Sequence, residues 1–356
     1  MPTGDPCPTH PLLVGYYGEH NLGDDALLTV LLQQLQHLSR PAEPLVTARD
    51  QEEVAGRFAV STVDRTSLRA VLQGLAGASS LVLGGGSLLQ DSTSFRSLLY
   101  YAALILAARL QGKPVLLWAQ GLGPLRRRRS RLLVGALLAR CTACSWRDAE
   151  SQSLAQQLGW RANGAALGSD PVWSLAGEPW RGRGGPLLLC FRPTPLLEGD
   201  RWRPWLEALE QLAPERELLW LPLHAHQDRG LLDQLTHQGL LSASLAARSR
   251  ELRPESPEEV IAAAASAGLV LAMRLHGLIL AALGGAPVVA LSYDPKVTAA
   301  AQALGCGLQE LSSPPDPRTL LADWQARLDV APDPTRLQQL REGVSVHRQL
   351  LEAHLR

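Results

Sequence analysis

The amino-acid sequence predicts an α/β protein built from two doubly wound domains that face each other across a cleft. Short apolar runs typical of strands alternate with helical segments along the chain, which is the pattern of a parallel sheet covered by helices. Gly and Pro gather at 176–186, and a new strand signal follows, so this segment is predicted to link the domains. A chain of 356 residues is long enough for two separate cores.

The predicted elements follow this order along the chain. The first domain, residues 1–177, is predicted to have strands near 12–17, 44–47, 80–84, 114–119 and 142–146, and helices near 25–38, 66–75, 95–110, 130–139 and 149–158. The second domain, residues 178–332, is predicted to have strands near 187–191, 217–221, 269–273 and 287–292, and helices near 202–212, 229–238, 257–267 and 277–283. A long amphipathic helix over 334–354 is expected in a C-terminal part, residues 333–356.

The composition excludes several classes of function. The formal net charge is zero, which argues against a nucleic-acid binder. The N-terminus lacks the pattern of a signal peptide, and no uninterrupted apolar stretch of ~20 residues is present, so we expect a cytoplasmic protein. Five cysteines at irregular spacing argue against a disulfide framework, and Cys141 and Cys144 are expected to be buried free thiols rather than half of a zinc site.

Residues 268–296 form one βαβ unit with a polar break after each strand. Arg274 and His276 follow the first strand, and Tyr293 and Lys296 follow the second. The carboxyl ends of neighbouring parallel strands meet at the edge where open α/β sheets bind ligands. The pattern therefore predicts a site for a small, strongly anionic molecule with a proton-transfer residue beside it.

Lys296 stands out because lysine is rare in this chain. Only two of the 34 basic residues are lysines, Lys113 and Lys296. A lysine retained at a strand end favours a role that needs a compact ammonium rather than a guanidinium.

Polar clusters also follow strands of the first domain. After the first strand come Asn21, Asp24 and Asp25, which are consistent either with capping of the next helix or with a site. Gly84-Gly85-Gly86-Ser87 follows another strand; it forms either a plain turn or a cradle for an oxyanion, and it lacks the spacing of a dinucleotide-binding fingerprint.

Three further strand ends carry candidate side chains. Arg147 and Arg192 each follow a predicted strand, so both could reach the cleft. His224 and His226 follow the strand near 217–221, but no carboxylate or cysteine pattern completes a metal shell. Substrate hydrogen bonding or a solvated loop is favoured there, and no metal is expected.

A basic run, Arg126–Arg129 with Arg131, lies between two predicted elements of the first domain. A solvated loop explains it most simply. The alternative is attraction to anionic lipid, at about 1 kcal/mol per charge near a membrane surface.

Seven motifs together resemble the polysaccharide pyruvyl transferase family, and within it the CsaB type. They extend in family order from about residue 12 to 310, and the last two are the most specific: GYYGEHNLGDDALL (15–28), LVLGGGSLLQD (81–91), GLGP (121–124), SWRDAES (145–151), GSDPVW (168–173), MRLHGLILAA (273–282) and GAPVVALSYDPKV (285–297). The resemblance implies two Rossmann-like domains, as in GT-B glycosyltransferases. It also implies transfer of pyruvate from phosphoenolpyruvate to a sugar as a cyclic ketal.

This chemistry agrees with the residues. Phosphoenolpyruvate carries a phosphate and a carboxylate, which Arg and Lys bind, and ketal formation needs proton transfer in the range of His. The resemblance implies that His276 is the acid/base and that Asp24 or Asp25 contacts the acceptor hydroxyls, with Asp24 taken as the catalytic residue of the two. It also implies the substrate-binding residues Arg274, Lys296, Arg192 and Arg147. Their places after predicted strands make Asp25, Asn21, Gly85, Gly86, Ser87, His224 and Tyr293 further candidate substrate-binding residues. No cofactor is expected, because phosphoenolpyruvate is the donor substrate.

The CsaB resemblance further implies an acceptor that contains N-acetylmannosamine, within a lipid-linked precursor of a cell-wall polysaccharide. The pyruvylated polymer would anchor S-layer proteins, and the enzyme could contact the inner leaflet of the membrane peripherally. Two rival functions are a nucleotide-sugar glycosyltransferase of GT-B fold and a non-enzymatic binding protein. Arg274, His276 and Lys296 argue against the second, since a decayed site need not keep all three.

Overall fold

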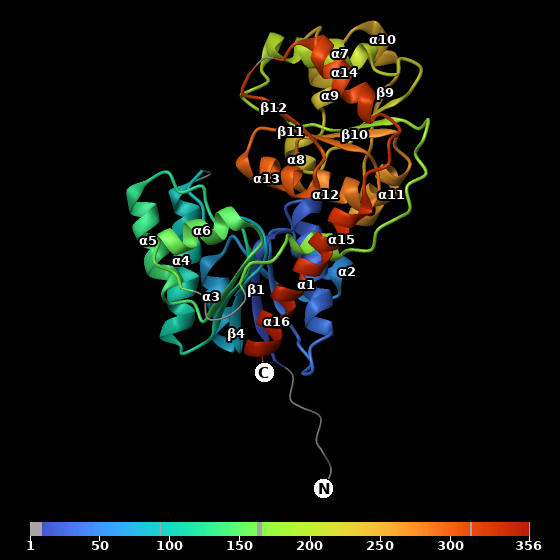
Figure 1. The fold of residues 1–356 in the computed structure, drawn as a ribbon. Helices are drawn as coiled ribbons and strands as arrows, with labels where there is room; N and C mark the ends of the chain where they lie inside the picture. Colours follow the sequence, from blue (N-terminus) through green and yellow to red (C-terminus); the bar gives the residue numbers. More distant parts are fainter. Residues whose placement is uncertain (1–8, 93, 162–165, 314, 356) are drawn as a thin grey trace. The chain divides into compact units, whose positions relative to one another are not determined.

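The computed structural model describes residues 9–92, 94–161, 166–313 and 315–355 (Figure 1). The chain separates into two compact units. The first comprises residues 1–19, 24–174 and 341–356, and the second comprises residues 20–23 and 175–340. A short N-terminal segment, residues 20–23, thus belongs to the unit that is otherwise made from the second half of the sequence.

The first unit is built on a six-stranded parallel sheet with strand order β3-β2-β1-β4-β5-β6. The strands are β1 (Pro11–Tyr17), β2 (Leu45–Ala48), β3 (Ser61–Asp64), β4 (Ser80–Leu83), β5 (Val115–Gln120) and β6 (Ala143–Trp146). The order reverses between β1 and β4, and ligands of doubly wound sheets bind outside the carboxyl ends of the strands at such a point.

Helices cover both faces of this sheet. They are α1 (Leu22–Gln36), α2 (Gln51–Phe58), α3 (Leu68–Gly77), α4 (Phe95–Leu110), α5 (Arg128–Leu138), α6 (Ala149–Gln157) and the C-terminal α16 (Ser345–His354). One core lies between the sheet and α3, α4, α5 and α6, while α16 packs on β5 and β6 (Figure 1).

The second unit repeats the same topology. Its parallel sheet has the order β12-β11-β10-β7-β8-β9, and the order reverses between β7 and β10. The strands are β7 (Leu187–Cys190), β8 (Leu218–Trp220), β9 (Ser249–Glu251), β10 (Leu269–Ala272), β11 (Val288–Ser292) and β12 (Gly307–Glu310). Each unit is therefore Rossmann-like, and the predicted α/β class is confirmed.

The second unit is also wrapped by helices. They are α7 (Arg203–Gln211), α8 (Ala225–Asp228), α9 (Leu231–His237), α10 (Ala243–Ala247), α11 (Pro257–Ala265), α12 (Leu275–Leu283), α13 (Pro295–Leu304), α14 (Pro317–Arg327) and most of α15 (Pro334–Gly343). α12 is buried along nearly its whole length, because it packs on α11, α13 and the sheet.

The sequence did not predict β3, β9 and β12. All three are edge strands, and their side chains are largely half-exposed or exposed. The central strands of a parallel sheet are buried on both faces and therefore appear as continuous apolar runs, whereas edge strands such as these lack that signal. Helices α2, α8, α10, α13 and α14 were not predicted either.

Three segments differ from the predictions in detail. Helix α1 begins at Leu22 rather than near Asp25, and Asn21 caps it by accepting a hydrogen bond from the Gly23 amide. The helix predicted over 334–354 is two helices, and they differ in burial. α15 buries no side chain, whereas α16 packs His347 and Leu351 against the first unit. The predicted linker lies along the second unit, where the Trp180 indole donates to the carbonyl of Ala267 at 2.8 Å.

The cysteines described by the structure are free thiols. Cys144 is buried in β6, as predicted, while Cys141 just before it is only partly buried. Cys7, also considered in the sequence, lies outside the described residues. Within the described ranges, no helix has the length and apolar character needed to cross a membrane.

Candidate functional site

The second sheet gathers cationic side chains at the carboxyl ends of three adjacent strands. Arg192 follows β7, Arg274 follows β10, and Lys296 lies in the first turn of the helix after β11. Because β10 pairs in parallel register with both β7 and β11, these ends lie on one edge. The two polar breaks predicted in the βαβ unit therefore stand side by side.

Arg274 is fixed by a buried carboxylate. Its Nε donates to Asp228 Oδ2 at 3.0 Å, its Nη2 pairs with Oδ1 of the same carboxylate, and Nη2 also donates to Gln227 Oε1 at 3.1 Å. The Asp228 side chain is fully buried. Burial disfavours the charged guanidinium, but the Asp228 charge outweighs this effect and leaves the pKa of Arg274 raised.

Arg192 reaches the same glutamine from the neighbouring strand. Its Nη1 donates to Tyr293 Oη at 2.9 Å, and its guanidinium lies 5.0 Å from the centre of the Tyr293 ring. Its Nη2 lies 3.5 Å from Gln227 Oε1. Two arginines on separate strands therefore share one neutral oxygen.

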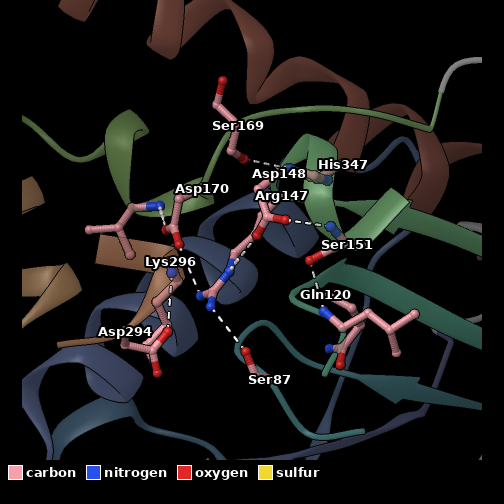
Figure 2. A network of polar contacts seen from close by, with 12 residues as sticks. Ser87, Gln120, Arg147, Asp148, Ser151, Ser169, Asp170, Asp294, Lys296 and His347 are labelled. Carbon is pink, nitrogen blue, oxygen red and sulfur yellow. Dashed lines mark hydrogen bonds and ion pairs between the residues drawn. The ribbon is translucent and has the colours of Figure 1, made fainter. Parts of the chain in front are cut away.

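Lys296 has an acidic neighbour of its own. Its Nζ lies 3.7 Å from Asp294 Oδ2, the pair drawn in Figure 2, and its side chain is 38% exposed. Asp294 also caps α13 by accepting from the Lys296 amide. The ammonium is thus held at the start of a helix, where the helix dipole favours bound anions.

His276 lies in the first turn of α12, and Gly23 packs against it. A Cβ atom at position 23 would lie 2.2 Å from His276 Nδ1, so only glycine fits there without displacing the ring. The segment that contains Gly23 is held by backbone bonds: the Leu22 amide donates to the Leu223 carbonyl, and the Ala225 amide donates to the His20 carbonyl.

His224 lies in the turn before α8, where Asn21 forms an isolated antiparallel bridge with it. The imidazole is 4% exposed, and neither ring nitrogen has a hydrogen-bond partner among the described residues. Burial and the nearby Arg274 guanidinium lower the pKa of His224 to about 4. His224 is therefore a neutral imidazole at physiological pH, with unused hydrogen-bonding capacity.

In the first unit, Arg147 is part of a buried network (Figure 2). Its Nη1 donates to Asp170 Oδ2 at 3.1 Å and its Nη2 donates to Ser87 Oγ at 3.1 Å. Gly121 makes room for this network, because a Cβ there would lie 2.6 Å from Ser87 Oγ. Ser87 and Arg147, predicted separately from two motifs, are thus in direct contact.

The two aspartates of the first unit differ in their surroundings. Asp25 is buried and accepts from Arg57 Nη1 at 2.8 Å; burial, only partly offset by Arg57, raises the pKa of Asp25 to about 7. Asp24 lies in the same helical turn, on the side of the glycine segment after β4: a Cβ at Gly86 would lie 3.7 Å from Asp24 Oδ1.

The glycines after β4 have separate structural reasons. Gly86 has a positive φ of 97°, which favours glycine, and its carbonyl accepts from the Gly121 amide. Gly85 packs closely against α1, because a Cβ there would lie 2.7 Å from a Leu27 methyl carbon.

Each unit thus assembles its own subset of the predicted residues. The second unit holds Asn21, Arg192, His224, Arg274, His276, Tyr293 and Lys296, and the first holds Asp24, Asp25, Gly85, Gly86, Ser87 and Arg147. Sequence reasoning missed Gln227, which contacts both arginines, and Asp228, which pairs with Arg274. The signal available was a carboxylate four residues after His224, at the end of the same strand-following segment.

Comparison with solved structures defines the class of fold. The UDP-GlcNAc 2-epimerase of Methanocaldococcus jannaschii is 11% identical, with 96% of this chain and 99% of that chain covered and a TM-score of 0.65. The Neisseria meningitidis UDP-GlcNAc 2-epimerase is 12% identical, with 97% of this chain and 99% of that chain covered and a TM-score of 0.63. The glycotransferase of kitacinnamycin is 15% identical, with 99% of this chain and 100% of that chain covered and a TM-score of 0.52. These likenesses show a GT-B-type fold.

The family is shown by the sequence. The family model for polysaccharide pyruvyl transferase matches residues 21–295, and the chain belongs to that family. Membership supports a transferase activity. No curated protein sequence matches the chain.

Proposed function

We propose that the protein transfers pyruvate from phosphoenolpyruvate to two hydroxyls of a sugar as a cyclic ketal, with release of phosphate. The observation that carries the proposal is the pair of arginines, Arg192 and Arg274, held at the strand ends beside the neutral His224. Guanidinium groups bind phosphate and carboxylate groups through charge-assisted hydrogen bonds, and phosphoenolpyruvate carries both.

The chemistry requires two proton movements. A proton is delivered to C3 of the donor, one sugar hydroxyl attacks C2, phosphate leaves, and the second hydroxyl closes the ring. The two sugar hydroxyls together release two protons. One of them makes up for the proton delivered to C3, which becomes part of the methyl group, and the other leaves on the phosphate. His276 is the proposed proton donor, with Arg192, Arg274 and Lys296 on the donor, and Asp24 is the proposed partner of the acceptor hydroxyls.

The proposed acceptor is an N-acetylmannosamine unit of a lipid-linked precursor of a cell-wall polysaccharide, as the CsaB resemblance implies. The experiment is phosphate release from phosphoenolpyruvate with a panel of synthetic lipid-linked disaccharides. Activity should persist in EDTA, because binding of the donor is assigned to cationic side chains. A strict requirement restored by Mg²⁺ or Mn²⁺ would overturn that assignment.

The rival function is transfer from a nucleotide sugar. The epimerase likeness concerns the fold alone, so it does not favour this rival. Thermal shifts with phosphoenolpyruvate and with UDP-GlcNAc separate the two functions. We expect stabilisation by the first compound only.

A peripheral membrane contact is proposed for the start of α5. The side chains of Arg126–Arg129 are exposed, the Arg129 guanidinium lies over the Phe95 ring, and Leu132 beside them is 77% exposed. Basic groups beside an apolar side chain suit an anionic bilayer surface. Sedimentation with phosphatidylglycerol vesicles tests this: Arg128→Glu/Arg131→Glu should lose binding, and the control Arg253→Glu/Arg318→Glu should keep it.

A further inference from the structure

Two like charges are held together in the second unit by a neutral side chain. The oxygen of the Gln227 amide lies 3.1 Å from Arg274 Nη2 and 3.5 Å from Arg192 Nη2. Guanidinium groups that share an acceptor repel each other, and a carboxylate at this position would neutralise them most directly. The chain instead has an amide, which orients both groups and leaves their charge in place.

The next residue, Asp228, holds Arg274 and the neighbouring turn in place beside the Gln227 amide. Asp228 accepts from the backbone amides of Leu223 and His224, at 3.2 Å and 2.9 Å, as well as from Arg274. It accepts from Nε and Nη2 of that arginine, and none of the described residues accepts a hydrogen bond from Nη1. One edge of the guanidinium is therefore anchored while the remaining nitrogen stays available to a ligand.

From this arrangement we propose that Gln227 and Asp228 are positioning residues for an anionic donor with two acidic groups. Asp228 orients Arg274 and the turn that carries His224, and Gln227 sets the separation of Arg274 from Arg192 without neutralising either. The inference rests on the proposed function, since phosphoenolpyruvate is the dianionic donor assigned there. It adds two residues that do not themselves touch the reacting atoms.

The charge of residue 227 provides the sharpest test. Gln227→Glu keeps the shape of the side chain but places a carboxylate between the two guanidinium groups. That carboxylate should stabilise the folded chain and compete with the donor for the same cations. The midpoint of thermal unfolding should therefore stay the same or rise, while the KM for phosphoenolpyruvate rises at least tenfold and kcat changes less than about threefold.

Two further variants keep the test specific. Gln234→Glu makes the same charge change on the exposed side of α9 and should leave both KM and the unfolding midpoint unchanged. Gln227→Ala removes the shared oxygen without adding charge, so its KM should rise less than that of Gln227→Glu. Added salt should reduce the difference in KM between these two variants, because the carboxylate of Gln227→Glu competes with the donor through electrostatic attraction to the arginines.

The outcomes separate the two proposals. A wild-type chain that neither binds phosphoenolpyruvate in calorimetry nor releases phosphate from it overturns the proposed function and the positioning role together. A wild-type chain that does so, with Gln227→Glu at the same KM, overturns the positioning role alone. A Gln227→Glu chain that is less stable than wild type also contradicts the role, because the proposal predicts the opposite change in stability.

Discussion

The two units have the same strand order but differ in the balance of charge at the carboxyl edge of the sheet. In the first unit the edge charges neutralise one another, as in the pairs Asp25–Arg57 and Arg147–Asp170. In the second unit Arg192 has a tyrosine and a glutamine as partners instead of an acid. A shared topology thus fixes where a site can lie, and a few side chains decide whether that site attracts an anion.

The acids at the two edges differ as well. Asp228 accepts from two backbone amides and two nitrogens of the Arg274 guanidinium, whereas burial raises the pKa of Asp25 to about 7 despite its arginine. The first of these carboxylates, Asp228, holds Arg274 and the turn before α8 in place. The second is poorly stabilised as an anion, so it is suited to exchange a proton near neutral pH.

The largest effect expected from breaking this asymmetry is on catalysis by the second unit. His276→Ala should lower pyruvyl transfer by ~10²–10⁴-fold, the usual contribution of a general acid or base. The fold should survive, since alanine suits a helix and the substitution adds no bulk against Gly23. Phosphate release and circular dichroism measure the two effects. Near wild-type turnover at every pH would make His276 a structural residue.

The next effect compares the buried ion pairs of the two units. Asp228→Asn leaves the Arg274 charge buried without its partner and should cost about 3–5 kcal/mol of unfolding free energy, the typical loss when one member of a buried pair is removed. Asp25→Asn, the matched substitution in the first unit, should cost under ~1 kcal/mol at pH 8, because the native carboxylate is itself disfavoured there. Urea unfolding of both variants measures the difference, and equal losses would contradict it.

The sequence predicted the parts of the fold that leave a local trace. Central strands such as β10 are continuous apolar runs, and residues just after such strands, for example Arg274, can be placed at the ligand edge by topology alone. The edge strands β3, β9 and β12 left no such trace, whereas the more buried edge strand β6 was predicted. Gln227 could not be predicted for another reason. Its role depends on which two side chains, distant in sequence, contact its oxygen, and spacing along the chain does not predict those contacts.

The same limit applies to the segment at residues 20–23. Its glycine and asparagine were predicted from turn and cap chemistry, and Asn21 does cap α1. That Gly23 lies against His276 follows only from the packing of the folded chain, which brings together residues far apart in sequence. Local chemistry thus identified the residues but not the partner that makes glycine necessary.

A third prediction concerns the first unit and pH. His347 Nε2 donates to the Ser169 carbonyl at 2.7 Å, and its Nδ1 accepts from the Ser145 hydroxyl at 2.9 Å. Burial lowers the pKa of His347 to about 4. In the unfolded chain the His347 side chain binds a proton below about pH 6.5, whereas in the native chain it binds one only below about pH 4. The stability that the neutral His347 contributes should therefore be fully present above pH 6.5. The unfolding free energy should fall by about 3 kcal/mol as the pH drops from 6.5 to 4.

The variant His347→Gln isolates this contribution. It should be less stable than wild type at pH 7.5, and its unfolding free energy should fall less between pH 6.5 and pH 4. His354→Gln, an exposed position on the same helix, should keep the wild-type slope. A wild-type slope in His347→Gln would show that other groups carry the acid sensitivity.

The last prediction uses the two lysines, one in each unit. Lys113 donates to the carbonyls of Leu75 and Ala76 at the end of α3, a structural capping role, whereas Lys296 stands at the cationic edge of the second sheet. Arginine is used at every other basic position, so Lys296→Arg asks whether the compact ammonium matters. We expect Lys296→Arg to lose at least tenfold in kcat/KM, about 1.4 kcal/mol in transition-state terms, because a planar guanidinium differs from a compact ammonium in size and in the directions of its hydrogen bonds. Lys113→Arg should keep wild-type kinetics, with any effect confined to stability. Equal and mild effects in the two variants would show that Lys296 is an ordinary surface charge, and the anion site would then rest on Arg192 and Arg274 alone.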